Sequence, residues 1–218
     1  MAERFAFFDF DNTLSRGESI VPYLRYCVRT GAAPRTQYLR AGAAWLSQLG
    51  HPEHIPRAKA KALSFLRGMA VEEADRLARG YFREVGGSLL FPAATEEVRR
   101  LAAEGVRVVV VSASPSAYMN ILEEVLPVEA VLCTQCLAEG GRYTGEVGPN
   151  CRGEEKVRRI REWLRSQGAA PAPRQVLAYG DSAGDVPMLR LSSAPVLVSP
   201  GKKAAAMLQE ARVVHWAQ

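Results

Sequence analysis

The chain has 218 residues, of which 48% are hydrophobic and 23% are charged, and its formal net charge is +5. This length is enough to bury the core of one large domain, or of one domain that carries an insertion. The 28 basic residues are spread along the chain without an interleaved aromatic cluster, so the composition does not support nucleic-acid binding. A modest positive charge suits a small anionic substrate or loose contact with a lipid surface.

Targeting and redox signals are few. Acidic residues interrupt the N-terminus where a signal peptide would be apolar, and no apolar stretch has the length needed to span a bilayer. We therefore expect a cytoplasmic protein with reduced thiols. Cys133 and Cys136 form a lone CxxC with no matching pair elsewhere, which does not favour zinc or redox chemistry.

The N-terminal segment is an aromatic-rich apolar run that ends in two carboxylates, Asp9 and Asp11. Such a run predicts a buried strand, although periodicity alone does not distinguish it from a buried helix segment. Because side chains alternate along an extended chain, both carboxylates would leave the strand on the same side. Two carboxylates this close repel each other, which favours a divalent metal or a shared proton beside them.

Two other interpretations of this segment exist. Asp and Asn are common in turns because they bond nearby backbone amides, so a plain turn stays open until the rest of the chain is considered. The pattern D-x-D-x-T also begins an EF-hand loop, which requires Gly at its sixth position and Glu at its twelfth. Those positions hold Leu14 and Ile20, so the calcium loop is excluded.

Four consecutive segments with helical periodicity follow, separated by short breaks. They cover about 18–29, 34–50, 56–67 and 71–85. Successive helices with short connections predict a small helical bundle, and the change of pattern after them indicates an inserted subdomain. We expect this helical cap to occupy residues 15–88, and residues 1–14 and 89–218 to form the core domain.

From residue 89 onward helices and strands alternate, which is typical of an α/β fold with a parallel sheet. Helices are expected at about 93–103, 116–126 and 154–166, and after residue 185. Strands are expected at about 106–111, 130–134, 175–179, 195–198 and 212–215. A hairpin is predicted for 136–138 against 143–147, because Gly140 and Gly141 suit a tight turn between them.

Three of the predicted strands end in polar residues. The first is followed by Asp9 and Asp11, the second by Ser112 and Ser114, and the third by Asp181 and Asp185. In a parallel sheet with right-handed crossovers these ends lie at one edge, where open α/β sheets bind ligands. Capping explains each cluster alone, but three clusters at one edge favour a functional site.

Four segments of the chain resemble the motifs of the haloacid dehalogenase (HAD) superfamily in order and interval: Asp9–Thr13, Ser112, Lys156 and Gly180–Asp185. The resemblance covers the whole chain and implies a Rossmann-like parallel sheet core with an inserted helical cap of the C1 type. This arrangement is similar to subfamily IB, which holds phosphoserine phosphatases and bacterial phosphatidylglycerophosphate phosphatases. The implied activity is Mg²⁺-dependent hydrolysis of a small phosphomonoester.

The resemblance assigns catalytic roles to four residues. Asp9 would attack phosphorus and form an aspartyl-phosphate, and Asp11 would protonate the leaving oxygen and then deprotonate water. Ser112 and Lys156 would neutralise the phosphoryl oxygens in the transition state. An acid at position 11 favours a phosphatase, because members of the superfamily that preserve the acyl-phosphate carry threonine there.

The same resemblance implies a magnesium site. The ion would be held by the Asp9 carboxylate, the Asp11 backbone carbonyl and Asp181, with water completing the octahedron. Asp185 and Ser182 would support these ligands from outside, by orienting the waters or the lysine.

Substrate binding is assigned to Thr13, Glu18, Ala113 and Arg152. Arg152 is also the second cation of the third motif, nearer to the spacing of phosphoserine phosphatases. Lys156 heads an amphipathic helix as in lipid-phosphatase-like members, and we expect it to be the phosphate-binding cation. The alternative, that both are surface charges of a helix, stays open.

The cap residues bear on the substrate. Glu18 falls where phosphoserine phosphatases bind the substrate amine, but Ala62 stands where they place the arginine for its carboxylate. Ala113-Ser114 and Gly184 also depart from their Gly-Gly and Asn. We therefore expect a small phosphorylated metabolite as substrate, and phosphoserine and a phospholipid-type substrate are the alternatives. A phosphotransferase or mutase and a non-enzymatic receiver-like switch are the alternatives of a different class.

Overall fold

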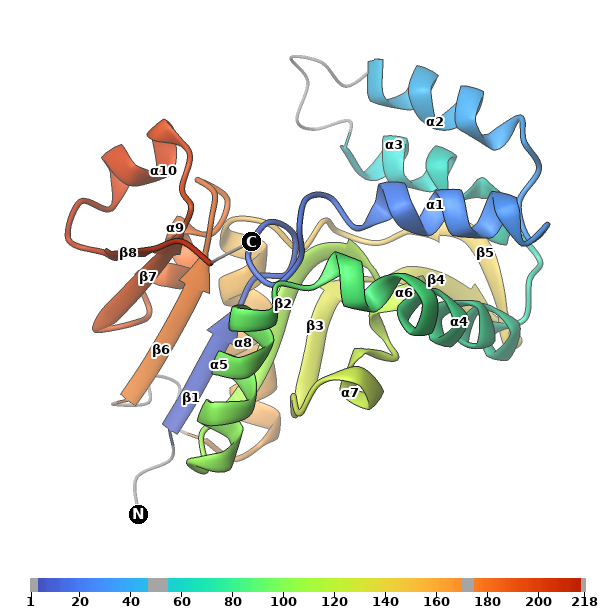
Figure 1. Cartoon of the computed structure of the whole chain (residues 1–218). Helices are drawn as coiled ribbons and strands as arrows, with labels where there is room; N and C mark the ends of the chain where they lie inside the picture. The colour runs from blue at the N-terminus through green and yellow to red at the C-terminus, as the bar shows by residue number, and fades with distance from the viewer. Residues whose placement is uncertain (1–3, 47–54, 170–174, 217–218) are drawn as a thin grey trace.

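The computed structural model describes residues 4–46, 55–169 and 175–216. At its centre is a six-stranded parallel sheet with the order β3-β2-β1-β6-β7-β8 (Figure 1). The strands of this sheet are β1 Arg4–Phe8, β2 Arg107–Pro115, β3 Ala130–Thr134, β6 Gln175–Gly180, β7 Ala194–Val198 and β8 Arg212–Val214. The predicted α/β fold with a parallel sheet is confirmed.

The other elements are helices and one antiparallel hairpin. The helices before β2 are α1 Ile20–Arg29, α2 Gln37–Leu46, α3 Ile55–Ala62, α4 Val71–Leu89 and α5 Pro92–Ala103, with a 3₁₀ turn η2 at Ser64–Leu66. Those after it are α6 Ser116–Met119, α7 Leu122–Val125, α8 Glu154–Ser166, α9 Val186–Leu189 and α10 Lys202–Met207. The hairpin pairs β4 Cys136–Glu139 with β5 Arg142–Val147, as the glycine turn predicts.

Successive side chains of β1 point to opposite faces of the sheet, and both faces are buried, which explains why this strand is apolar throughout. Phe5 and Phe7 enter one buried cluster with residues of α8 and α9, whereas Ala6 and Phe8 enter the cluster on the opposite face, with α5. A parallel strand covered by helices on both faces needs apolar side chains at every position. Asp9, the first polar residue after this run, therefore marks the place where the chain leaves the sheet.

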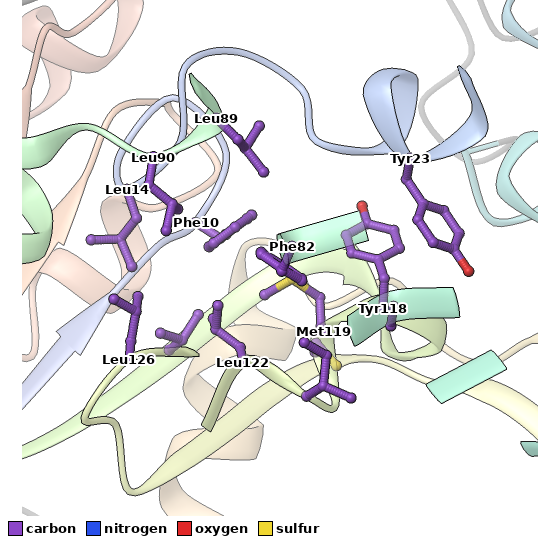
Figure 2. Close-up of a cluster of buried hydrophobic side chains, with 14 of the residues drawn as sticks. Phe10, Leu14, Tyr23, Phe82, Leu89, Leu90, Tyr118, Met119, Leu122 and Leu126 are labelled. Atoms are coloured by element: carbon purple, nitrogen blue, oxygen red, sulfur yellow. The ribbon is translucent and has the colours of Figure 1, made fainter. Parts of the chain in front are cut away.

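The inserted helices pack directly against the core. Tyr23 of α1 lies beside Tyr118 of α6, with 4.6 Å between ring centroids, and Phe82 of α4 belongs to the same cluster (Figure 2). Tyr81 of α4 also packs there, against Phe82 and Tyr118. The buried side chains of the insertion and those above the sheet form one continuous cluster. The expected boundaries at residues 14 and 88 stay a prediction.

The insertion differs from a simple four-helix bundle. Helices α2 and α3 pair with each other, and the segment between η2 and α4 runs along the hairpin (Figure 1). The backbone N–H of Gly68 donates to the Tyr143 carbonyl at 2.8 Å, and the Tyr143 N–H donates to Met69 at 3.0 Å. The core hairpin thus supplies part of the insertion's support. The predicted end of the second helix, beyond Leu46, lies outside the described residues.

Several elements differ from the sequence predictions. Helix α4 continues through Gly86 and Gly87 to Leu89, past its predicted end at residue 85, and α3 ends at Ala62 instead of residue 67. Strand β2 continues to Pro115, with an irregular register between Ser112 and Pro115. The helix expected at 116–126 is two single turns, because Ile121 has ψ near 2° and opens the helix between them. Helix α10 was not expected from the sequence. Within the described residues, none of the helices is long and apolar enough to cross a membrane.

Candidate active site

Asp9 lies at the point where the strand order reverses. Strand β1 is flanked by β2 on one side and β6 on the other, and the Asp9 N–H donates to the Tyr179 carbonyl at 2.9 Å. Open α/β sheets bind ligands at such a switch point, beyond the carboxyl ends of the strands. Asp181, directly after β6, is thereby brought beside Asp9, although 171 residues lie between them in the sequence.

A tight turn after β1 sets the direction of Asp11. The N–H groups of Leu14 and Ser15 both donate to the Phe10 carbonyl, at 2.8 and 2.9 Å. Asn12 lies within this turn with φ at 60°, in the left-handed region that Asn tolerates better than most residues. The Asp11 side chain accepts the Ser19 N–H at 2.8 Å and the Ser114 hydroxyl at 2.5 Å. The turn therefore holds a second carboxylate at the same edge of the sheet.

Lys156 is the cation that pairs with Asp9. It lies in the first turn of α8, is 1% exposed, and its ammonium donates to Asp9 Oδ1 at 2.5 Å and Asp185 Oδ1 at 2.7 Å. Gly153, with φ at 62°, precedes the helix and donates its N–H to the Gly184 carbonyl at 2.9 Å, which ties α8 to the loop after β6. Burial lowers the pKa of Lys156, but the two carboxylates outweigh it and raise that pKa above its usual value.

Asp185 has both of its carboxylate oxygens occupied. Oδ1 accepts the Lys156 ammonium, and Oδ2 accepts the N–H and the hydroxyl of Ser182 at 3.0 and 2.7 Å. Burial raises its pKa, but Lys156 and the Ser182 bonds outweigh burial and hold the pKa of Asp185 below its usual value. Asp185 is therefore a charged support for Lys156 at neutral pH.

Negative charge exceeds positive charge around Asp9. One oxygen each from Asp9, Asp181 and Asp185 lies within 4.8 Å of the others. Burial, and then the Asp185 charge, raise the pKa of Asp9 well above its usual value and that of Asp181 to about 7. Such shifts indicate carboxylates that lack enough positive charge, and a hard oxygen-binding divalent cation would supply it. The donor set fits a metal such as Mg²⁺.

A single cavity collects most of the expected residues. It is lined by Asp9, Asp11, Asn12, Glu18, Ala113, Arg152, Lys156, Asp181, Ser182 and Asp185. Nine of these ten are residues singled out from the sequence, and they come from the ends of β1, β2 and β6, the start of α8 and the loop before α1. Burial, and then the Asp11 charge, raise the pKa of Glu18.

Two expected residues do not line this cavity. Thr13 is fully buried, and its hydroxyl has no hydrogen-bond partner among the described residues. Ser112 is also fully buried, and its hydroxyl accepts the Ser114 N–H at 3.0 Å. The substrate-binding role of Thr13 and the catalytic role of Ser112 stay predictions, and they would need these hydroxyls to turn.

Sequence reasoning did not assign Lys59 or Ser114 to the site. The Lys59 ammonium, from α3, donates to the Ala113 carbonyl at 2.5 Å and to Asn150 Oδ1 at 2.6 Å. Burial lowers the pKa of Lys59 to about 8, although Asp11 and Glu18 oppose the shift. The sequence places Ser114 in the polar cluster after the second strand and marks it as a departure from the Ser-Gly-Gly pattern, but gives it no role in the site.

Arg152 occupies space that Gly184 leaves open. A Cβ atom at position 184 would lie 2.7 Å from Arg152 Nε. The absence of a side chain there lets the guanidinium reach the cavity wall. Gly184 and Arg152 are thus one structural feature, although the sequence presents Gly184 only as a departure from the phosphoserine phosphatase pattern and Arg152 only as a second cation of the third motif.

The comparisons with known proteins agree with this geometry. The family model of the haloacid dehalogenase-like hydrolases matches residues 6–190. The chain belongs to this family. It is therefore an enzyme of the HAD hydrolase class, and the family resemblance expected from the four motifs is confirmed.

Three named relatives of this HAD hydrolase are similar to it over most of its length. The protein CicA of Caulobacter vibrioides is 31% identical over 189 residues, which cover 85% of this chain and 81% of the relative. A probable phosphatase of Mycobacterium tuberculosis is 28% identical over 214 residues, with 97% and 73% covered. The phosphoserine phosphatase SerB1 of the same organism is 26% identical over 215 residues, with 94% and 68% covered.

Solved structures share the fold of this HAD hydrolase. A protein of unknown function from Bordetella pertussis is 25% identical, with a TM-score of 0.87 and coverage of 98% and 99% of the two chains. A phospho-aspartyl intermediate analogue of phosphoserine phosphatase is 18% identical, with a TM-score of 0.62 and coverage of 100% and 95%. At that identity the likeness speaks for the fold alone.

Proposed function

We propose that this HAD hydrolase is a Mg²⁺-dependent phosphomonoesterase that acts through a phosphorylated Asp9. The observation that carries the proposal is the Lys156 ammonium at 2.5 Å from Asp9 Oδ1, inside a cavity that Asp11 and Asp181 also line. A carboxylate nucleophile, an acid–base carboxylate and a buried cation are the groups that hydrolysis in two steps requires.

In the first step an Asp9 carboxylate oxygen attacks phosphorus, and the bond from phosphorus to the ester oxygen breaks. That ester oxygen takes a proton from the Asp11 carboxyl group as it leaves. In the second step a water oxygen attacks the same phosphorus, its proton passes to Asp11, and the bond to Asp9 breaks. Phosphate leaves, and both carboxylates return to their starting state.

Lys156 stabilises the charge that develops on the phosphoryl oxygens. Its position is fixed by Asp185, which in turn is fixed by Ser182, so the ammonium needs little reorganisation when substrate binds. Arg152, on the wall of the same cavity, is a second cation for these oxygens or for the leaving group. We place Lys156 first because its ammonium is hydrogen-bonded to Asp9.

Magnesium would be held by the Asp9 carboxylate, the Asp11 backbone carbonyl and Asp181. When bound, it would supply positive charge between the nucleophile and the phosphoryl group, which otherwise repel each other. Asp185 is less suited to be a direct ligand, because three hydrogen bonds already occupy its oxygens. We propose instead that it supports Lys156, with which it forms an ion pair.

The insertion between β1 and β2 supports membership of subfamily IB with a C1-type cap. Glu18 enters the cavity from this insertion, and Lys59 reaches the cavity wall from α3. Ala62, where a carboxylate-binding arginine would be expected for phosphoserine, is 3% exposed and apolar. We therefore favour a small phosphorylated metabolite other than phosphoserine.

A panel of phosphomonoesters assayed with wild type and Asp9→Asn tests this proposal. We expect metal-dependent phosphate release that EDTA and Asp9→Asn abolish, and no marked preference for phosphoserine. Turnover of phosphoserine well above other esters would restore that substrate. Phosphate appearing on an added alcohol would indicate a phosphotransferase, and a stable phosphorylated protein without turnover would indicate a switch.

A phospholipid-type substrate is the second candidate, and one observation favours it. Helix α2 exposes Leu39 at 76%, Leu46 at 71% and Tyr38 at 44% of their surface, beside Arg35 and Arg40. An apolar face with basic neighbours suits the surface of an anionic membrane. Co-sedimentation with anionic liposomes at low and moderate salt tests it, and absence of binding at both would remove this candidate.

A further inference from the structure

The Asp11 carboxylate stands at the end of a series of buried hydroxyl groups. Ser114 donates to Asp11 Oδ2 at 2.5 Å, and Tyr118 donates to the Ser114 oxygen at 3.0 Å. The Ser19 hydroxyl lies 2.9 Å from the Tyr118 oxygen and 3.1 Å from that of Ser114. These three hydroxyl-bearing residues are all 3% exposed or less.

The direction of these hydrogen bonds follows from counting protons. Each hydroxyl has one proton to donate and can accept two bonds. Ser114 gives its proton to Asp11, and Tyr118 gives its proton to Ser114. Ser19 is then left to donate to Tyr118 or to Ser114. All donors therefore point toward the carboxylate, and every hydroxyl has a partner for its proton.

The network joins the insertion to the sheet. Ser114 belongs to β2 and Tyr118 to α6, whereas Ser19 immediately precedes α1 and also gives its N–H to Asp11 Oδ1 at 2.8 Å. Tyr81 of α4 donates to the Ser19 carbonyl at 3.0 Å, which holds that residue in turn. A fully satisfied buried network specifies one geometry, because any rotation leaves a buried polar group unpaired.

We propose that Ser114 is a positioning residue for the acid–base function of Asp11, with Tyr118 orienting the Ser114 hydroxyl. This inference rests on the proposed function. Each carboxylate oxygen of Asp11 accepts one bond and keeps a second lone pair, and the side chain lines the cavity. Two fixed bonds from outside the cavity set the rotation of the carboxylate, and hence which lone pair meets the substrate. Removal of the Ser114 hydroxyl leaves only the Ser19 N–H to hold it.

p-Nitrophenyl phosphate separates this role from a general loss of structure. Nitrophenolate leaves without a proton, so phosphorylation of Asp9 is spared when Asp11 is misplaced, whereas hydrolysis of the phosphorylated enzyme still requires it. For Ser114→Ala we expect a stoichiometric burst of nitrophenolate and then a steady rate about 10²-fold below wild type. Ser116→Ala is the matched control, because its buried hydroxyl accepts the Cys136 N–H and does not touch the network.

Tyr118→Phe tests the same inference without creating a cavity. The ring stays and the hydrogen-bond donor to Ser114 is lost. We expect the steady rate to fall about tenfold, which corresponds to the free energy of one hydrogen bond. In the Ser114→Ala background the same change should cost nothing further, because the group that it orients is gone. A double variant with additive losses would contradict the inference, and so would a Ser114→Ala enzyme that loses the burst together with the steady rate.

Different results would contradict the positioning role of Ser114 and the proposed phosphatase activity. A wild-type protein that releases no nitrophenolate with Mg²⁺ contradicts the proposed function, and the positioning role with it. An active wild type whose steady rate is the same in Ser114→Ala, Ser116→Ala and Tyr118→Phe contradicts the positioning role alone.

Discussion

The Lys156 ammonium and the Asp9 carboxylate form a buried ion pair, 2.5 Å long, between the start of α8 and the end of β1. The partners are 2% and 9% exposed at their side chains, so solvent does not screen the pair. In the proposed mechanism the same ammonium, held in place by Asp185, stabilises the charge on the phosphoryl oxygens.

Lys156→Met should lower kcat by about 10³-fold, because the charge on the transferring phosphoryl group loses its closest protein cation. Steady-state kinetics with p-nitrophenyl phosphate measure this, and circular dichroism checks that the variant is folded. Arg161→Met, at an exposed position of the same helix, is the control and should keep wild-type rates. If Arg152→Met abolished turnover and Lys156→Met did not, the assignment of the two cations would be reversed.

Gly184→Ala should reproduce the effect of Arg152→Met. The added Cβ would approach the Arg152 side chain to 2.7 Å, so the guanidinium has to leave its place on the cavity wall. We expect KM to rise about tenfold in both single variants, the loss of one charge-assisted contact, and no further in the double variant. Gly87→Ala, where a Cβ meets nothing within 4 Å, is the control. A KM unchanged in Gly184→Ala but raised in Arg152→Met would show that the arginine acts from another position.

Asp181→Ala should weaken the response to magnesium. We expect the Mg²⁺ concentration for half-maximal activity to rise by about 10–100-fold, as for the loss of groups around a metal site. The rise in Tm that Mg²⁺ produces in the wild type should shrink equally, which gives a readout independent of turnover. Glu139→Ala, on the exposed hairpin, should leave both curves in place. Identical magnesium curves for Asp181→Ala and wild type would remove Asp181 from the metal site.

Lys59 predicts a pH dependence of stability with a definite sign. Burial lowers its pKa to about 8 in the folded protein, against about 10.4 in an unfolded chain. Above pH 8 the folded protein releases this proton while the unfolded chain keeps it. The contribution of Lys59 to the free energy of unfolding therefore increases with pH. Below pH 8 both states hold the proton, and the cost of burying the charge is fully present.

Urea unfolding of wild type and Lys59→Met compares the two proteins across this window. Between about pH 7 and about pH 9.5, the wild type should gain about 1–2 kcal/mol relative to the variant. Lys61→Met, at an exposed position of the same helix, should follow the wild type. Parallel curves for wild type and Lys59→Met would show that the ammonium is solvated rather than buried.

Residues that belong to strand ends could be predicted from the sequence, because topology alone brings them together. Asp9 and Asp181 follow apolar runs, and a parallel sheet places the ends of such runs at one edge. Lys156 could be assigned from its motif at the start of a helix. The β2 irregularity had no such signal, and it turns the Ser112 hydroxyl toward Ser114 instead of the cavity.

Residues that reach the site from the insertion could not be predicted in the same way. The position of Lys59 depends on how α3 packs over the ends of the strands, and no local pattern separates it from the exposed Lys61 two residues later. Ser114 and Tyr118 act through a network that closes only when α1, α6 and β2 meet. Hydrogen bonds between distant elements leave no periodicity in the sequence.

The most direct test of the account is to find the phosphoryl group on the protein. Asp11→Asn should still be phosphorylated by p-nitrophenyl phosphate with Mg²⁺ but should hydrolyse the intermediate slowly, so the modified protein accumulates. Acid quenching followed by peptide mass spectrometry is expected to place one phosphoryl group on Asp9, and none in the double variant that also carries Asp9→Asn. Wild-type turnover retained in Asp9→Asn, or a phosphoryl group found on another residue, would contradict the proposed mechanism.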